Sequence, residues 1–180
     1  MKALLEQTEL KALTDPQFLN SLGFTPDKGI LFLGGVGVGK TFTMKEISKG
    51  NRKGWGSIGQ PTMYFKDSPI YEDDITGIGL SIFSSRNSSN SLNAFKEHDL
   101  YLDDIGAESE SVNSFGNKFD PIAYILQMRY DVRNSFKTYI TSNLSEYLLE
   151  ERYGARVYSR IKDMCDIVIV KGGEDLRGRF

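Results

Sequence analysis

The stretch 29-GILFLGGVGVGKTFTM-44 decides how the rest of this sequence is interpreted. Four apolar residues, from Ile30 to Leu33, are typical of a short buried strand, and they lead into a glycine-rich segment that ends in Lys40-Thr41. The spacing G-x-x-x-x-G-K-T, placed between a strand and a plausible helix start, predicts a loop that wraps around phosphate groups. An ordinary glycine-rich turn is the alternative, and the agreement of spacing with context disfavours it.

Each part of this loop has a chemical task. Glycines let the backbone adopt unusual dihedral angles, so that successive N–H groups point at one anion, and the following helix adds its positive end. Lys40 supplies a cation for the outer phosphates, and the Thr41 hydroxyl supplies an oxygen for Mg²⁺. We therefore expect a nucleoside triphosphate, taken to be ATP, bound with Mg²⁺. The residues expected to contact the nucleotide are Gly34, Gly35, Val36, Gly37, Val38, Gly39, Lys40, Thr41 and Phe42.

Composition limits the classes of protein to consider. The 180 residues correspond to one domain with a substantial core, and the net charge of −2 excludes a uniformly basic surface. DNA contact would therefore need a local patch or assembly. The single cysteine, Cys165, fits a reducing cytoplasm and is expected to be buried, while the lone His98 cannot build a metal site. No apolar run is as long as a membrane span, and the N-terminus is too polar for a signal peptide, so we predict a cytoplasmic protein.

Two further strands are predicted to end in polar residues that complete the site. The strand at 100–102 runs into Asp103-Asp104, and the strand at 138–141 is followed by Ser142-Asn143. We expect the first of these strands to neighbour the strand of the phosphate loop, because both motifs belong at carboxyl ends of strands. Asp103 would then hold hydrated Mg²⁺, Asp104 would polarise the attacking water, and Asn143 would sense the γ-phosphate. The alternatives are that Asp103 and Asp104 are solvated residues of a turn, and that Asn143 only caps a helix or a turn.

The remaining pattern predicts an α/β fold with a mainly parallel, five-stranded sheet in three layers. Residues 1–28 are expected to form a helical lead-in to a domain spanning 29–180. Further strands are expected at 62–66 and 166–170, helices at 40–48, 120–133, 145–153 and 155–164, a weaker helix at 70–83, and a polar loop at 108–118.

A glycine-rich basic loop follows the first helix of the predicted nucleotide site. It carries Lys49, Arg52, Lys53 and Trp55, which would grip single-stranded nucleic acid by charge and stacking, or else belong to a solvated loop. Arg86, in a later polar loop, is a further candidate for a phosphate contact.

Four segments in this order and spacing, GGVGVGKT, YLDDIGAE, YITSN and RYGARVYSRI, resemble the AAA+ ATPases of the DnaC/IstB type, which include helicase loaders and transposition helper ATPases. The resemblance covers roughly residues 28–180. It implies that Gly34 to Thr41 form the Walker A motif, Asp103-Asp104 the Walker B motif and Asn143 sensor 1. Arg160 matches the arginine finger that enters a neighbouring subunit's site, with Arg156 as the substitute in another register. The implied partners are a replicative helicase or transposase, single-stranded DNA, and copies of the chain that assemble on ATP.

The sequence departs from that family in three ways. Asp104 stands where many AAA+ proteins have glutamate, so the attacking water must lie nearer or hydrolysis is slow. Residues 1–28 cannot replace the N-terminal domain with which such loaders hold a helicase. The chain ends soon after the last predicted strand, so the helical lid is expected to be absent or minimal, with Arg177 as a stand-in for its arginine.

Two other functions remain open from the sequence. A small-molecule kinase with a phosphate loop has a similar length, although the paired acids followed by TSN disfavour it. A nucleotide-controlled interaction module with little turnover is the second alternative, and it is favoured by the shorter Asp104 and the missing lid.

Overall fold

The computed structural model describes residues 1–47, 62–65, 96, 99–108, 112–114 and 117–172. Several predicted features lie outside the described residues: the basic loop with Trp55, the weak helix at 70–83, Arg86, His98 and Arg177. In the part of the chain that is described, no helix combines the length and hydrophobicity needed to cross a membrane.

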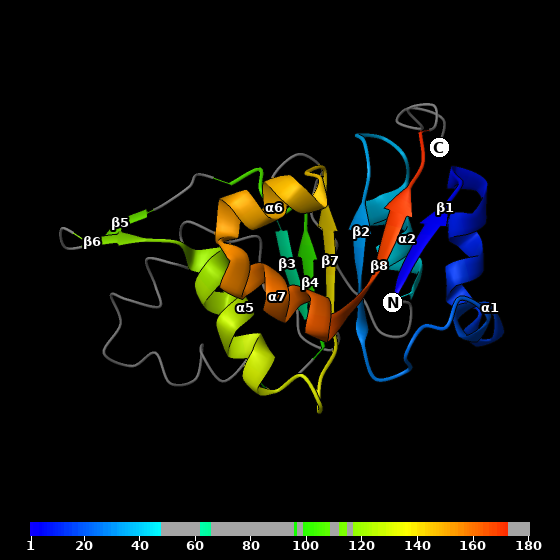
Figure 1. Cartoon of the computed structure of the whole chain (residues 1–180), viewed down its shortest axis with the longest axis horizontal. Coiled ribbons are helices and arrows are strands. Elements are labelled where there is room, and N and C mark those ends of the chain that lie inside the picture. The colour runs from blue at the N-terminus through cyan, green and yellow to red at the C-terminus, as the bar shows by residue number, and fades with distance from the viewer. Residues whose placement is uncertain (48–61, 66–95, 97–98, 109–111, 115–116, 173–180) are drawn as a thin grey trace.

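A six-stranded sheet forms the centre of the molecule, in the order β1-β8-β2-β7-β4-β3 (Figure 1). The first five strands in this order pair in parallel, and β3 pairs antiparallel with β4. The predicted α/β class with a mainly parallel sheet is thereby confirmed. The strands are β1 (Lys2–Leu5), β2 (Gly29–Leu33), β3 (Thr62–Phe65), β4 (Leu100–Asp103), β7 (Thr138–Ser142) and β8 (Cys165–Val170).

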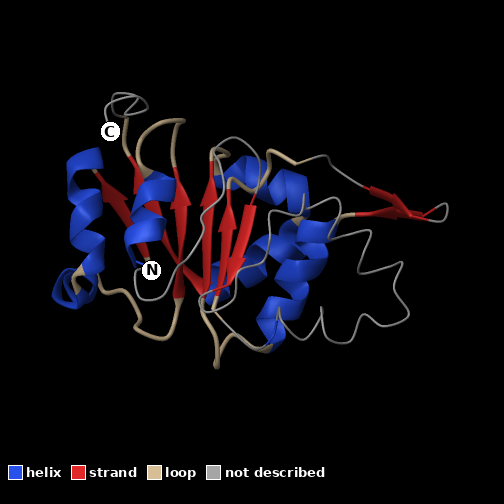
Figure 2. Ribbon diagram, turned by 180° about the vertical axis from the view of Figure 1, so that it is seen from behind, coloured by secondary structure: helices blue, strands red, loops and turns tan. Residues whose placement is uncertain are grey.

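Helices cover both faces of the sheet, which gives the three expected layers. Figure 1 shows α6 and α7 in front of the sheet with α2 behind it, and Figure 2 shows the reverse side. The helical elements are η1 (Gln7–Thr14), α1 (Pro16–Ser21), α2 (Lys40–Ile47), α5 (Pro121–Asp131), α6 (Glu146–Tyr153) and α7 (Ala155–Met164).

Alternating side chains on the buried strands feed two separate cores. In β2, Leu31 and Leu33 pack with residues of α5, α6 and α7, whereas Ile30 and Phe32 pack on the opposite face with residues of η1 and α2. All five residues of β2 are buried, as expected for a central strand of a parallel sheet. Its uniformly apolar sequence is therefore explained by burial on both sides.

The helices on the first face begin and end where local chemistry predicts. Asp120 accepts a hydrogen bond from the Ala123 N–H at the start of α5, and Pro121 occupies the first turn. Ser145 caps α6 in the same way, and Gly154, at φ 84°, separates α6 from α7. These boundaries agree with the sequence-based expectation because capping depends on residues within a few positions of the helix end.

The fully buried Arg129 fastens α5 to the start of β7. Its Nε donates to Thr138 Oγ1 at 3.0 Å and its Nη2 donates to the Lys137 carbonyl at 2.8 Å. Burial lowers the pKa of Arg129 to about 10. Cys165 is buried nearby, as predicted, and its thiol donates to the Thr138 carbonyl.

Three segments differ from the expectation. Residues Lys2–Leu5 form strand β1 along β8, so the lead-in is helical only from Gln7 onward and the sheet has six strands rather than five. Leucines at positions 4 and 5 fit a helical stripe, but backbone pairing to an open sheet edge prevails over that pattern. Within the segment predicted as a polar loop, β5 (Val112–Ser114) and β6 (Asn117–Phe119) pair as an antiparallel hairpin that projects from the body.

Candidate functional site

The phosphate loop links the buried end of β2 to the first turn of α2. Gly34, Gly37 and Gly39 have φ angles of 154°, 79° and 95°, a region that side chains with a Cβ rarely adopt. At Gly34 an added Cβ would also lie 3.0 Å from the Val170 carbonyl oxygen. These three glycines are thus required by the backbone path, which is the arrangement that directs N–H groups inward.

Lys40 turns its ammonium group back into this loop. Its Nζ donates to the carbonyl oxygens of Gly34 at 2.8 Å and Gly35 at 2.7 Å, and to Asn143 Oδ1 at 2.7 Å. The residue is only 6% exposed. A buried ammonium group at this position places a positive charge inside the loop, where it can attract the phosphate groups of a nucleotide.

Asp103, at the end of β4, receives two hydroxyl groups. Thr41 Oγ1 donates to Asp103 Oδ1 at 2.8 Å, and Thr141 Oγ1 donates to the same oxygen at 2.6 Å. Asp103 and Thr41, which the motifs predict as magnesium ligands, are thus in direct contact. Thr141 was not among the predicted residues. Its position near the carboxyl end of a strand, just before Ser142-Asn143, is the feature of the sequence that could have identified it as a site residue.

Asp104 adopts a left-handed backbone conformation, with φ 56°, the one non-glycine residue among those described that does so. Its N–H donates to Thr141 Oγ1 at 2.7 Å, and its Oδ1 accepts from Asn143 Nδ2 at 2.5 Å. Aspartate tolerates this conformation better than longer side chains, since its short polar group can bond locally. The left-handed backbone at position 104 therefore explains why an aspartate occurs here, where the family that the sequence resembles often has glutamate.

Together these contacts join the start of α2 to the ends of β7 and β4 in a chain of hydrogen bonds, which the peptide bond between Lys40 and Thr41 closes into a ring. The ring passes from α2 to β7, to β4, and back to α2, because β7 lies between β2 and β4 in the sheet. The expectation that the loop strand and the acidic strand are direct neighbours is wrong, since sheet order is not encoded in local motifs. The members of the ring are Lys40, Asn143, Asp104, Thr141, Asp103 and Thr41.

Burial and the neighbouring carboxylate of Asp103 raise the pKa of Asp104, although Lys40 and the Asn143 amide act in the opposite direction. A carboxylate with a raised pKa is a better proton acceptor than an ordinary aspartate while it stays ionised near neutrality. The amide orientation of Asn143 follows from its partners, because its oxygen accepts from Lys40 and its nitrogen donates to Asp104.

The other predicted loop residues are arranged around this ring. Val38 is buried in the core beside α2, whereas Val36 is 52% exposed and Phe42 is 45% exposed. Two apolar side chains beside the loop are therefore partly exposed to solvent.

Arg160 lies away from the ring of its own chain. Its guanidinium packs over the ring of Tyr130 on α5, 4.8 Å from the centroid, and Arg133 packs against the same ring at 4.0 Å. Arg156, one turn earlier on α7, is exposed. The structure thus does not join either arginine to the predicted site within one chain, and an arginine finger remains a prediction about a neighbouring copy.

The donor set around Thr41 and Asp103 suits Mg²⁺. A hydroxyl and a carboxylate oxygen are hard ligands, and Mg²⁺ is typically held by one or two such groups together with substrate phosphates and water. Among the described residues, no group of three or more histidine, cysteine or acidic side chains converges as a metal cage. The residues present therefore fit a metal that arrives with a phosphate ligand.

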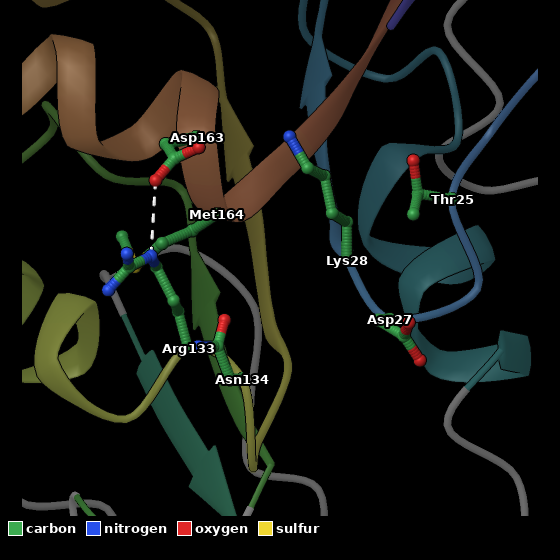
Figure 3. Close-up of a pocket in the computed structure, with 7 residues that line it drawn as sticks. All are labelled: Thr25, Asp27, Lys28, Arg133, Asn134, Asp163 and Met164. Carbon is green, nitrogen blue, oxygen red and sulfur yellow. Dashed lines mark ion pairs between the residues drawn. The ribbon is translucent and has the colours of Figure 1, made fainter.

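A separate pocket of about 240 Å³ opens at the opposite end of the strands (Figure 3). Lys28 precedes β2 and Met164 precedes β8, so this pocket lies at the amino ends of the strands, away from the phosphate loop. Arg133 and Asp163 form an ion pair at its wall, at 3.1 Å. No predicted site residue lines it.

Two solved structures share this architecture. A crystal structure of the DnaC helicase loader matches with a TM-score of 0.54 and 22% identity, over 88% of this chain and 91% of that chain. A crystal structure of DnaI matches with a TM-score of 0.52 and 21% identity, over 91% of this chain and 84% of that chain. No family model and no curated protein sequence matches the chain. At this identity the likeness concerns the fold alone: the chain has the α/β fold of the DnaC and DnaI structures, in agreement with the fold class predicted from its sequence.

Proposed function

We propose that this protein is a Mg²⁺-dependent ATPase of the DnaC type that acts with a replicative helicase in DNA replication. The observation that carries the proposal is the hydrogen-bonded ring at the strand ends. It joins the loop lysine to a sensor amide and an acid, and the loop threonine to a second acid. The fold it shares with a helicase loader supports the choice of process.

The residues of the ring divide into binding and catalytic roles. Lys40 and the loop amides would hold the phosphates, while Thr41 and Asp103 would hold the metal. Bound there, Mg²⁺ would neutralise charge on the phosphate oxygens. Asp104 would orient and deprotonate the attacking water, and Asn143 would position both Asp104 and the terminal phosphate.

Completion of the site in a neighbouring copy is the second part of the proposal. Arg160 sits outside its own chain's site, so it would act in trans, with Arg156 as the alternative from the preceding turn. Hydrolysis would then depend on assembly, and single-stranded DNA would raise it by favouring that assembly. A transposase in place of the helicase is the alternative partner.

The direct test is ATP turnover with and without single-stranded DNA in the wild type and in Lys40→Ala. We expect the variant to lose nearly all turnover, because removing a positioned cation from developing phosphoryl charge typically costs on the order of 10²–10³-fold in rate. Turnover that survives the substitution would show that another site, or a contaminant, is responsible.

Assembly is tested separately by gel filtration with and without a non-hydrolysable ATP analogue. A shift to a larger species with the analogue is expected, and Arg160→Ala should assemble normally while losing turnover. A monomer under every condition would leave Arg160 without a site to complete. Co-purification with the replicative helicase, dependent on nucleotide, tests the partner.

A further inference from the structure

The turn that follows the acidic pair ends in a buried carboxylate, Glu108, that the roles given above do not use. Its side chain is only 5% exposed. Glu108 Oε2 accepts a hydrogen bond from the Gly106 N–H at 2.7 Å. Gly106 has a φ of 92° and follows Asp104 by two residues, so this bond holds the backbone that leads directly out of the catalytic acid.

The other oxygen of the same carboxylate reaches α6. Glu108 Oε1 accepts from Arg152 Nη2 at 3.1 Å and from the Tyr153 hydroxyl. Arg152 is itself 12% exposed, and its Nη1 donates to Asp120 Oδ2 at 2.7 Å. The other oxygen of Asp120 caps α5, so Glu108 and Asp120, joined through Arg152, connect the turn with both α6 and α5.

These groups keep their donor and acceptor roles near neutral pH. Burial acts to lower the pKa of Arg152, but the carboxylates of Asp120 and Glu108 outweigh it and the pKa lies above the usual value. Burial, followed by the charge of Glu108, raises the pKa of Tyr153. Arg152 therefore stays a cation and Tyr153 a hydroxyl donor, so the contacts to Glu108 persist wherever the acid is ionised.

We propose that Glu108 is a positioning residue for the ATP hydrolysis proposed above, on which this inference rests. It fixes the turn that aims Asp104 and ties that turn, through Arg152 and Tyr153, to α6. A single glycine separates α6 from α7, which carries Arg160. The conformation of the catalytic acid in one site is thereby coupled to the helix pair that would face a neighbouring copy in the proposed assembly.

The chemistry of the contacts requires a carboxylate rather than an amide. Glu108 uses one oxygen toward Gly106 and the other toward Arg152 and Tyr153, and all three partners are donors. Glutamine has one acceptor oxygen and one NH₂ group. In Glu108→Gln either the bond to the turn or the bonds to α6 must be lost, while the volume of the side chain is unchanged.

The experiment compares steady-state ATP turnover by the full chain of the wild type, Glu108→Gln, Arg152→Gln and the double variant. We expect Glu108→Gln to lower kcat about tenfold, since small misplacements of a catalytic group have effects on this order or larger. The KM for ATP should stay within about twofold, because the phosphate loop is untouched. The double variant should be no slower than the slower single variant, since contacting residues in one network are not additive. Glu151→Gln, the same change at an exposed position of α6, should behave as the wild type.

Three results would overturn the inference. A Glu108→Gln protein with wild-type kcat would remove the positioning role, and a rise in KM with unchanged kcat would place Glu108 in nucleotide binding instead. Fully additive losses in the double variant would show that Glu108 does not act through Arg152. Absence of turnover in the wild type would refute the proposed function first, so the two failures are distinguishable. If Glu108→Gln does not fold, Tyr153→Phe removes one donor alone, and wild-type kcat in that variant would then decide against the proposal.

Discussion

Thr141 offers the sharpest test of how the site is held together. Its side chain is 1% exposed at the end of β7, between the two acids. The hydroxyl donates to Asp103 Oδ1 at 2.6 Å and accepts from the Asp104 N–H at 2.7 Å. Thr141→Val removes both bonds while keeping a branched side chain suited to a strand.

The cost of this change follows from the two bonds. A hydrogen bond to a charged group contributes about 1.5–3 kcal/mol, and a buried N–H left without a partner costs about 1–3 kcal/mol. Asp103 keeps its bond from Thr41, and valine is the better strand former, so the low end of each range applies. We therefore expect a loss of about 2.5 kcal/mol in the free energy of unfolding.

Equilibrium urea unfolding followed by far-ultraviolet circular dichroism measures this loss. With a slope of about 2 kcal/mol per molar urea, the midpoint should fall by about 1.3 M. ATP turnover should also fall about tenfold, because the backbone of Asp104 loses its anchor. Thr141→Ser is the matched control: it keeps the hydroxyl and loses one buried methyl group, which costs about 1 kcal/mol.

A midpoint for Thr141→Val as high as that of the wild type would refute the reasoning. It would mean that the hydroxyl contributes nothing beyond the volume of the side chain. A stability loss without any change in turnover would instead confine Thr141 to a structural role.

Two further predictions concern the same strand ends. In Asp104→Asn, turnover should be abolished, and stability relative to the wild type should rise with pH. The Asp104 carboxyl group ionises near pH 4 in the unfolded chain, whereas burial and Asp103 raise its pKa in the folded state. The wild type therefore loses stability as the pH rises from about 4 through the folded-state pKa, and the asparagine variant does not. Urea midpoints at pH 4 to 8 measure the difference, and a gap that stays constant with pH would contradict it. Gly106→Ala should cost about 2 kcal/mol or more, because φ is 92° and the new Cβ would lie 2.4 Å from Leu144 Cδ1. Gly154→Ala shares the positive φ with no atom within 4 Å, so equal losses in the two variants would exclude a steric contribution from Leu144.

Much of the candidate site could be predicted because its chemistry is local. The phosphate loop depends on glycine dihedral angles and on a helix start within a few residues, and the helix caps at Asp120 and Ser145 depend on the same short range. The acids at the end of β4 and the amide after β7, which the sequence suggests as site residues, lie together in the structure. Their roles in hydrolysis stay predictions.

Other features could not be predicted, because they depend on residues far apart in the sequence. Thr141 looks like any strand threonine until two acids from another strand lie on either side of its hydroxyl. Glu108 looks like one of several solvated acids in a polar segment until Arg152 and Tyr153 surround it.

The sequence by itself determined that a glycine-rich loop follows a buried strand, that acids and an amide end two other strands, and that helices alternate with them. Only the tertiary structure decided that β7 lies between β2 and β4, that Lys2–Leu5 adds a strand beside β8, and that Asp104 takes a left-handed conformation. The physical reason is the range of the interactions. Dihedral preferences and caps act between neighbours along the chain, whereas strand order follows from which faces can be buried together, and that depends on the whole chain at once.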